Sequence, residues 1–174
     1  MAVKSPGYKR ELLNQLINFF WTILFFAPVL LFWINEGINL YFYLSIAFAL
    51  ILGILPEKIL NRLMLSSNRK FYERLGVRFI RNFVQNGDAV KAMTNTRNRF
   101  IIHGVFQAQQ YLKTIAMYER FHWICFTFFL FTAIRCFFTG NFKLGLAISA
   151  ANVLYNLSTI LLQQYNKIRI KNFR

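Results

Sequence analysis

Long stretches without a charged residue constrain this chain more than any other feature of its sequence. The first covers residues 17–34, eighteen in a row, and a second covers 40–55 after a short polar turn. An α-helix of about 20 apolar residues spans the roughly 30 Å hydrocarbon core of a bilayer. Both stretches are therefore predicted to be membrane helices, joined as a hairpin. Its second helix is expected to stop at Pro56, because proline cannot donate the next backbone hydrogen bond.

Two further apolar stretches predict a second hairpin. The stretch 121–138 is interrupted only by Arg135, which is expected to reach the outer interface, and 142–164 is richer in small residues and asparagine. The composition agrees, since only 16% of the 174 residues are charged, against about 25% in soluble domains. We predict one all-α membrane domain over 1–174, a polytopic protein with four transmembrane helices: 17–34, 40–55, 121–138 and 142–164.

The positive charges are distributed asymmetrically. Lys and Arg number 21 against six Asp and Glu, for a formal net charge of +15, and nineteen of the 21 lie outside the apolar stretches and the two short turns. Lys and Arg are enriched in cytoplasmic loops. Both termini and the segment 56–120 are therefore predicted to be cytoplasmic. Basic proteins often bind nucleic acid, but the apolar stretches favour membrane lipid as the partner and no nucleic acid.

The cytoplasmic segment is predicted to be a basic amphipathic helix rather than a linker. Apolar side chains recur at helical spacing on one arc: Phe71, Leu75, Phe79 and Phe83. Basic side chains occupy the opposite arc: Lys70, Arg74, Arg78 and Arg81. Such a helix can lie in the headgroup layer, or its rings can pack against the other helices. A turn is expected at 86–88, followed by a second amphipathic stretch over 99–120 that leads into the third span.

Most enzyme motifs are absent from the sequence. It has no Gly-rich phosphate loop, no paired carboxylates, no Cys-x-x-Cys pair and no histidine cluster, which excludes most hydrolase, nucleotide-binding and zinc-site classes. We therefore expect no metal and no cofactor.

Glu119 and His122 are the candidates for chemistry. They are three residues apart, on one helix face, just before Trp123 at the predicted membrane boundary. A carboxylate in this position could orient the imidazole and raise its basicity, so that it takes a proton from a hydroxyl that attacks an activated acyl group. The alternative is that Glu-x-x-His-Trp is only a polar collar around an aromatic membrane anchor.

Amide side chains are concentrated in the fourth predicted span. Asn152 and Asn156 lie one helical turn apart, and a polar run follows: Gln163, Gln164, Tyr165, Asn166, Lys167 and Arg169. Buried amides are costly in hydrocarbon unless they are paired. They are expected either to join helices or to line a polar cleft for a hydroxylated headgroup.

Three sequence blocks, taken in order, resemble the bacterial glycosyl-4,4'-diaponeurosporenoate acyltransferase family. The blocks are Pro56-Glu57-Lys58, the Glu-x-x-His-Trp that ends at Trp123, and the terminal run from Asn156 to Arg169. The resemblance covers roughly residue 55 to the C-terminus, with a weaker similarity over 72–87. Gln164 and Lys167 stand where this family tends to have arginine, and Ser158 where it often has proline.

The resemblance implies a multi-pass acyltransferase of the bacterial inner membrane that acts on a glycosylated or lipid hydroxyl acceptor, such as a glycosyl carotenoid. We expect His122 to be the general base, oriented by Glu119, with acyl-CoA or another acyl donor as co-substrate. The anionic headgroup of the acyl donor is expected to bind four basic side chains: Lys167, Arg169, Arg78 and Arg81. The remaining substrate-binding candidates are Asn152, Asn156, Gln163, Tyr165 and Asn166. The alternative is a non-catalytic membrane protein whose basic segment binds a partner or anionic lipid.

Overall fold

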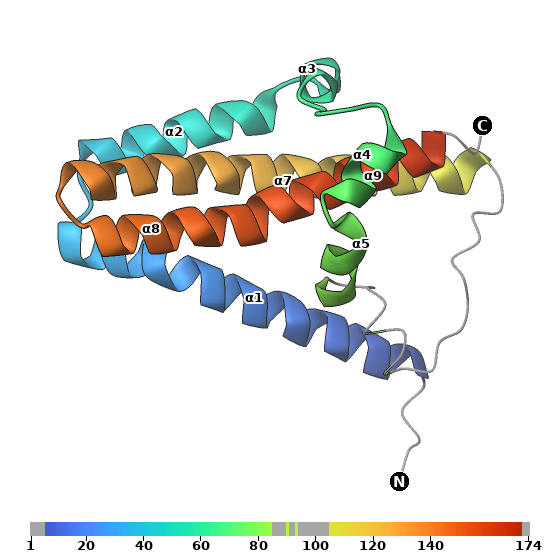
Figure 1. Ribbon diagram of the computed structural model, residues 1–174, viewed down its shortest axis with the longest axis horizontal. Coiled ribbons are helices and arrows are strands. Elements are labelled where there is room, and N and C mark those ends of the chain that lie inside the picture. The colour runs from blue at the N-terminus through green and yellow to red at the C-terminus, as the bar shows by residue number, and fades with distance from the viewer. Residues whose placement is uncertain (1–5, 85–89, 91–92, 94–104, 172–174) are drawn as a thin grey trace, which may run out of the picture.

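The computed structural model describes residues 6–84, 90, 93 and 105–171, and helices are the only regular structure within these residues. Two long helical hairpins lie side by side (Figure 1). The first consists of α1 (Pro6–Glu36) and α2 (Leu40–Ile54). The second pairs α7 (Val105–Phe138) with three consecutive helical segments: α8 (Phe142–Ala151), the π-helix η2 (Asn152–Leu157) and α9 (Ser158–Lys171). The predicted all-α class is confirmed.

Three helices are long and apolar enough to cross a membrane: Tyr8–Glu36, Phe106–Phe138 and Phe142–Ile170. They contain three of the four predicted spans. The remaining one, α2, has 15 residues and is therefore about 22 Å long, short of the roughly 30 Å hydrocarbon core. The structure thus shows an all-helical chain with three candidate membrane spans, which is the architecture of a multi-pass membrane protein.

Both hairpin turns lie at one end of the bundle, opposite the short helices and the end of α9 (Figure 1). Gly37 and Gly140 have φ angles of +80° and +77°, a conformation that suits glycine and ends each preceding helix. The guanidinium of Arg135 pairs with Glu36 at 2.7 Å. This ion pair joins the turn end of α7 to that of α1.

The apolar core at this end joins α1, α7 and α8. Its buried members include Phe32, Trp33, Phe129 and Ile148. A Cβ on Gly145 would lie 2.8 Å from the Phe137 ring, so glycine is what allows α8 to approach α7 this closely. The outward faces of α1 and α2 expose many large apolar side chains, as expected for helices that contact lipid.

The connection between the hairpins contains short helices: α3 (Glu57–Arg62), α4 (Arg69–Arg74), α5 (Val77–Ile80) and the 3-10 helix η1 (Arg81–Phe83). The prediction of one amphipathic helix across this region is wrong. Gly76, with φ at +77°, separates α4 from α5. In Figure 1, α4 and α5 run across the long axis of the bundle.

The apolar arc of this region does not pack against the other helices. Its four members remain exposed: Phe71, Leu75, Phe79 and Phe83. Tyr72 and Val77 are buried instead, in a cluster with Leu161, Tyr165 and Ile168 of α9. The turn expected at 86–88 and the start of the second amphipathic stretch lie outside the described residues. From Val105 onward that stretch is one continuous helix with the third span, as predicted.

Candidate active site

The predicted site residues from α7 and from the fourth apolar stretch meet inside the bundle. His122 Nδ1 lies 3.2 Å from Asn156 Oδ1, and both side chains are buried. One turn earlier on α7, Glu119 Oε2 lies 2.6 Å from Lys167 Nζ. Two residue groups that are more than thirty positions apart in sequence therefore form one polar layer between α7 and the η2 and α9 segments.

A directional series of hydrogen bonds determines which nitrogen of His122 carries the proton. Asn152 Nδ2 donates to the backbone carbonyl of Phe126 at 3.0 Å, and Asn156 Nδ2 donates to Asn152 Oδ1 at 2.9 Å. Because a carbonyl can only accept, both amides are oriented, and Asn156 presents its oxygen to the imidazole. His122 Nδ1 must therefore be the donor, which leaves Nε2 with its lone pair in the neutral ring.

The two asparagines lie on a π-helical turn. Residues Asn152–Leu157 form η2, and such turns inside longer helices occur frequently at functional sites. Asn152 is 4% exposed and Asn156 is fully buried, so their amides would be costly without partners. The series from Phe126 to His122 satisfies them and joins α7 to η2. This contact accounts for the buried amides as links between helices and also orients the imidazole.

The remaining surroundings of His122 are aromatic. Its ring packs edge-on against Tyr155, with 5.2 Å between centroids, and against Phe121 at 5.3 Å. The Tyr155 hydroxyl lies 2.9 Å from Thr22 Oγ1 on α1, and Thr22 itself donates to a backbone carbonyl, so Tyr155 is the donor. Within the described part of the chain, Nε2 makes no hydrogen bond. The imidazole is thus held through Nδ1, and Nε2 is left without a hydrogen-bond partner among the described residues.

The expected contact between Glu119 and His122 does not form. Glu119 Oε2 accepts from Lys167 Nζ, and Glu119 Oε1 accepts from Gln164 Nε2 at 3.0 Å, while His122 faces Asn156. The physical reason is charge: the Lys167 side chain is only 4% exposed, and an ammonium in this position requires a carboxylate. The prediction that Glu119 orients His122 directly is therefore wrong.

Glu119 belongs to a second network that fastens the connecting segment to the bundle. Gln164 Oε1 lies 3.0 Å from the Tyr72 hydroxyl and accepts from the Leu65 backbone N–H at 3.2 Å. Lys167 Nζ also donates to Asn61 Oδ1 at 3.0 Å. Burial raises the pKa of Tyr72, so its hydroxyl remains protonated at neutral pH.

Sequence reasoning missed two members of this network, Tyr72 and Asn61, and placed Gln164 in the polar run without naming it as a site residue. Gln164 is fully buried and has partners in α7, in α4 and in the loop before α4. A signal was present, because Gln164 and Lys167 are the two positions at which the resemblance noted above predicts arginine. Both side chains bond to the Glu119 carboxylate, so they form one structural feature.

The other predicted substrate-binding residues fall into different places. Tyr165 donates to Glu73 Oε1 at 3.1 Å, and Arg78 pairs with the same oxygen at 3.0 Å. Arg169 stacks on the Tyr165 ring. Lys167 is buried in the Glu119 network and does not face an open surface. The last three of the predicted substrate-binding residues are partly exposed and lie outside both networks: Gln163, Asn166 and Arg81.

Comparison with known proteins identifies one family. Residues 56–174 match the family model described as CrtO, glycosyl-4,4'-diaponeurosporenoate acyltransferase. The match covers more than half of the chain and includes both polar networks, whereas the α1–α2 hairpin precedes it. No curated protein matches, and no solved structure matches.

Proposed function

Because this chain belongs to the glycosyl-4,4'-diaponeurosporenoate acyltransferase family, we propose that it transfers a fatty acyl chain to a hydroxyl of a glycosylated or lipid acceptor, such as a glycosyl carotenoid. The family description supplies the acyltransferase activity and the class of acceptor. The observation that supports a reacting group in this chain is the open Nε2 of His122, whose ring is oriented through Nδ1 by Asn156.

The proposed reaction uses His122 as general base. Nε2 takes the proton of the acceptor hydroxyl as its oxygen attacks the carbonyl carbon of the acyl donor. The new ester C–O bond forms, the bond from the carbonyl carbon to the leaving group breaks, and the leaving group takes the proton from the imidazolium. Asn156 Oδ1 accepts the Nδ1 hydrogen throughout, which keeps the ring oriented while its charge changes.

Glu119 acts in this proposal through α9 rather than through the imidazole. Its ion pair with Lys167 and its bond with Gln164 fix α9 against α7. Asn156 lies on η2, which continues directly into α9, the helix that carries Lys167. The ion pair therefore helps to hold Asn156 at hydrogen-bonding distance from His122. Asn156 and Asn152 are engaged in the series that orients His122, so acceptor contacts are proposed for the partly exposed Gln163 and Asn166 of α9.

The proposed topology has four spans, with α2 crossing a locally thinned bilayer and both termini and residues 56–120 in the cytoplasm of a bacterial cell. It is supported by the charge asymmetry and by the position of both turns at one end of the bundle. The test is labelling of Asn39→Cys and Lys58→Cys with a membrane-impermeant maleimide in intact cells. Position 39 should react and position 58 should not, and the opposite pattern would reverse the orientation.

The test of the reaction is His122→Ala in the purified full-length protein. A general base typically contributes 10²- to 10⁴-fold, so ester formation should fall by about that factor. The thermal unfolding midpoint in detergent should fall, because the buried Asn156 Oδ1 loses its partner, but the protein should remain folded at the assay temperature. The product is followed by mass spectrometry with extracts that contain the glycosylated lipids of a host cell. Unchanged turnover would remove His122 from the mechanism.

A second candidate function has one specific observation in its favour. The exposed ring face of α4 and α5 lies across the bundle axis, with basic side chains nearby, as expected for a segment that rests on anionic lipid. A non-catalytic lipid-binding or partner-binding protein would bind anionic vesicles strongly and produce no acylated species with any lipid extract. A new acylated species that depends on His122 would exclude it.

A further inference from the structure

Three arginine side chains from separate parts of the chain converge on one carboxylate and one tyrosine. Glu73 Oε1 accepts from Arg69 Nε at 2.9 Å, pairs with Arg78 Nη2 at 3.0 Å and accepts from the Tyr165 hydroxyl. The guanidinium carbons of Arg69 and Arg169 lie 5.7 and 5.6 Å from the centre of the Tyr165 ring. We name Arg69, Arg78 and Arg169 the arginine cluster.

The arginine cluster is organised but not neutralised. One carboxylate, Glu73, pairs with two of the three guanidinium groups, those of Arg69 and Arg78, so the cluster has an excess of positive charge. The Tyr165 ring is 2% exposed and fixed at its hydroxyl, which gives the stacked guanidiniums a rigid base. Glu73 remains ionised at neutral pH: desolvation acts to raise its pKa, but hydrogen bonds from Arg78, Tyr165 and Arg69 lower the pKa overall.

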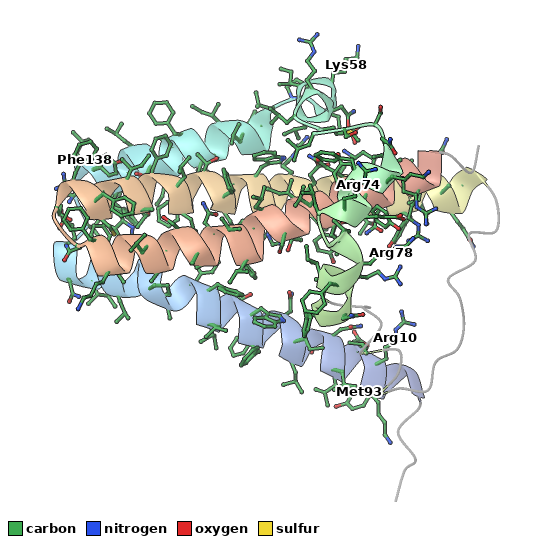
Figure 2. All side chains as sticks on the ribbon, viewed as in Figure 1. Arg10, Lys58, Arg74, Arg78, Met93 and Phe138 are labelled. Atoms are coloured by element: carbon green, nitrogen blue, oxygen red, sulfur yellow. The ribbon has the colours of Figure 1, made fainter. Side chains whose placement is uncertain are left out.

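The cluster also keeps unused hydrogen-bond donors. Each guanidinium has five N–H groups, and the side chains of Arg69 and Arg78 are 50% and 65% exposed. Arg169 makes no hydrogen bond to any residue that the structure describes, and its stacking on Tyr165 leaves the N–H edges available. Planar guanidinium forks of this kind match the oxygens of a phosphate group. In Figure 2, Arg78 lies on the side of α5 at which α9 ends.

We propose that the arginine cluster binds the phosphate groups of the acyl donor, an inference that rests on the proposed acyltransferase function. Tyr165 of α9 lies nine residues after Asn156 of η2, a separation of about 13 Å along the helix axis. A coenzyme A thioester has a long pantetheine arm between its phosphates and its acyl carbonyl, whereas only a few bonds separate these groups in a glycerophospholipid. The separation between the cluster and His122 therefore favours the thioester.

The experiment compares an arginine of the cluster with a nearby arginine outside it. Arg78 belongs to the cluster, whereas Arg74 is exposed on α4 and has no part in it (Figure 2). Binding of coenzyme A is measured by calorimetry on the full-length protein in phosphatidylcholine nanodiscs. Arg78→Gln and Arg169→Gln should each raise the Kd roughly tenfold, the loss expected for one charge-assisted contact, and Arg74→Gln should change it less than about twofold. Arg169→Lys should also weaken binding, because it keeps the charge but not the fork.

The controls separate this proposal from the reaction. His122→Ala should bind coenzyme A as the unmodified protein does, so loss of transfer with intact binding concerns the base alone. A second arm uses nanodiscs that contain phosphatidylglycerol without coenzyme A. If only lipid retention depends on Arg78 and Arg169, the phosphate site stands and its source is the lipid. Equal losses for Arg74→Gln and Arg78→Gln, or no saturable binding of either ligand, would overturn the proposal.

Discussion

Two polar networks lie between α7 and the η2 and α9 segments, and they differ in whether each polar atom has a hydrogen-bond partner. In the Glu119 network, a carboxylate, an ammonium and an amide bond to one another and to α3 and α4, and each has its partners. In the His122 network, two amides and an imidazole are neutral, and one ring nitrogen has no partner within the described residues. Saturation indicates a structural role, and the open nitrogen indicates a chemical one.

The difference matters because the group proposed to react, His122, is not the buried ion pair. A buried ion pair attracts attention as a candidate active site. Here the carboxylate oxygens of Glu119 and the ammonium of Lys167 already have hydrogen-bond partners, so few donors or acceptors remain for a substrate. The neutral series can bind a proton without first breaking a bond. The predictions that follow test whether the first network governs stability and the second governs turnover.

The largest expected effect on stability is that of Lys167→Ala. Removal of one partner from a buried ion pair leaves an uncompensated charge, which typically costs about 3–5 kcal/mol. The free energy of unfolding in detergent should fall by that amount. Lys113→Ala, which removes an exposed lysine from α7, is the matched control and should stay within about 0.5 kcal/mol of the unmodified protein.

A double variant sharpens the same point. Glu119→Gln with Lys167→Met removes both charges, so it should be more stable than Lys167→Ala alone. If it also retains acyl transfer, the ion pair is structural. If transfer is lost while the protein stays folded and Asn156 still bonds to His122, Glu119 has a chemical role and the comparison fails.

The next effect is that of Asn156→Leu, which removes the acceptor of the Nδ1 hydrogen. The imidazole then loses its orientation, and acyl transfer should fall by about 10- to 100-fold, by analogy with the loss seen when the partner that orients a metal-ligating histidine is removed. Gln15→Leu, an exposed amide on α1, is the control and should leave the rate within about twofold. A normal rate for Asn156→Leu would show that the hydrogen-bond series has no part in turnover.

Sequence patterns predicted the features that depend on composition and spacing. The apolar stretches predicted both hairpins, and the amides at 152 and 156 were expected either to join helices or to line a polar cleft. The partner of Glu119 could not be predicted, because it depends on how α9 is rotated against α7. Spacing along α7 suggested His122 as the partner of Glu119, but the cation that pairs with Glu119 is Lys167 of α9. The break at Gly76 was hidden by an amphipathic pattern that continued across it.

A smaller effect is expected for Tyr155→Phe. The variant loses the hydrogen bond to Thr22 but keeps the ring that packs on His122, so the free energy of unfolding should fall by about 1 kcal/mol. Acyl transfer should change less than it does in Asn156→Leu. If Tyr155→Phe lost as much transfer as Asn156→Leu does, the Tyr155 hydroxyl would also have a part in the reaction.

The smallest effect concerns pH and the partly buried carboxylate of Glu73. Its folded-state pKa is lowered, so its contribution to stability is present above the ordinary pKa of glutamate and is lost as the pH falls through the lowered value. The unfolding midpoints of the unmodified protein and of Glu73→Gln should therefore differ at neutral pH and converge in acid. A constant difference across this pH range would show that ionisation of Glu73 is not involved.

The most direct test of the central claim is ¹⁵N NMR of histidine-labelled protein in detergent. The chain has two histidines, so a His103→Gln variant assigns the signal of His122. Near neutral pH the ring should carry its proton on Nδ1, with Nε2 unprotonated, and Asn156→Leu should remove this preference. A ring protonated on Nε2 in the unmodified protein would contradict the account, because that nitrogen could not then accept a proton from a hydroxyl.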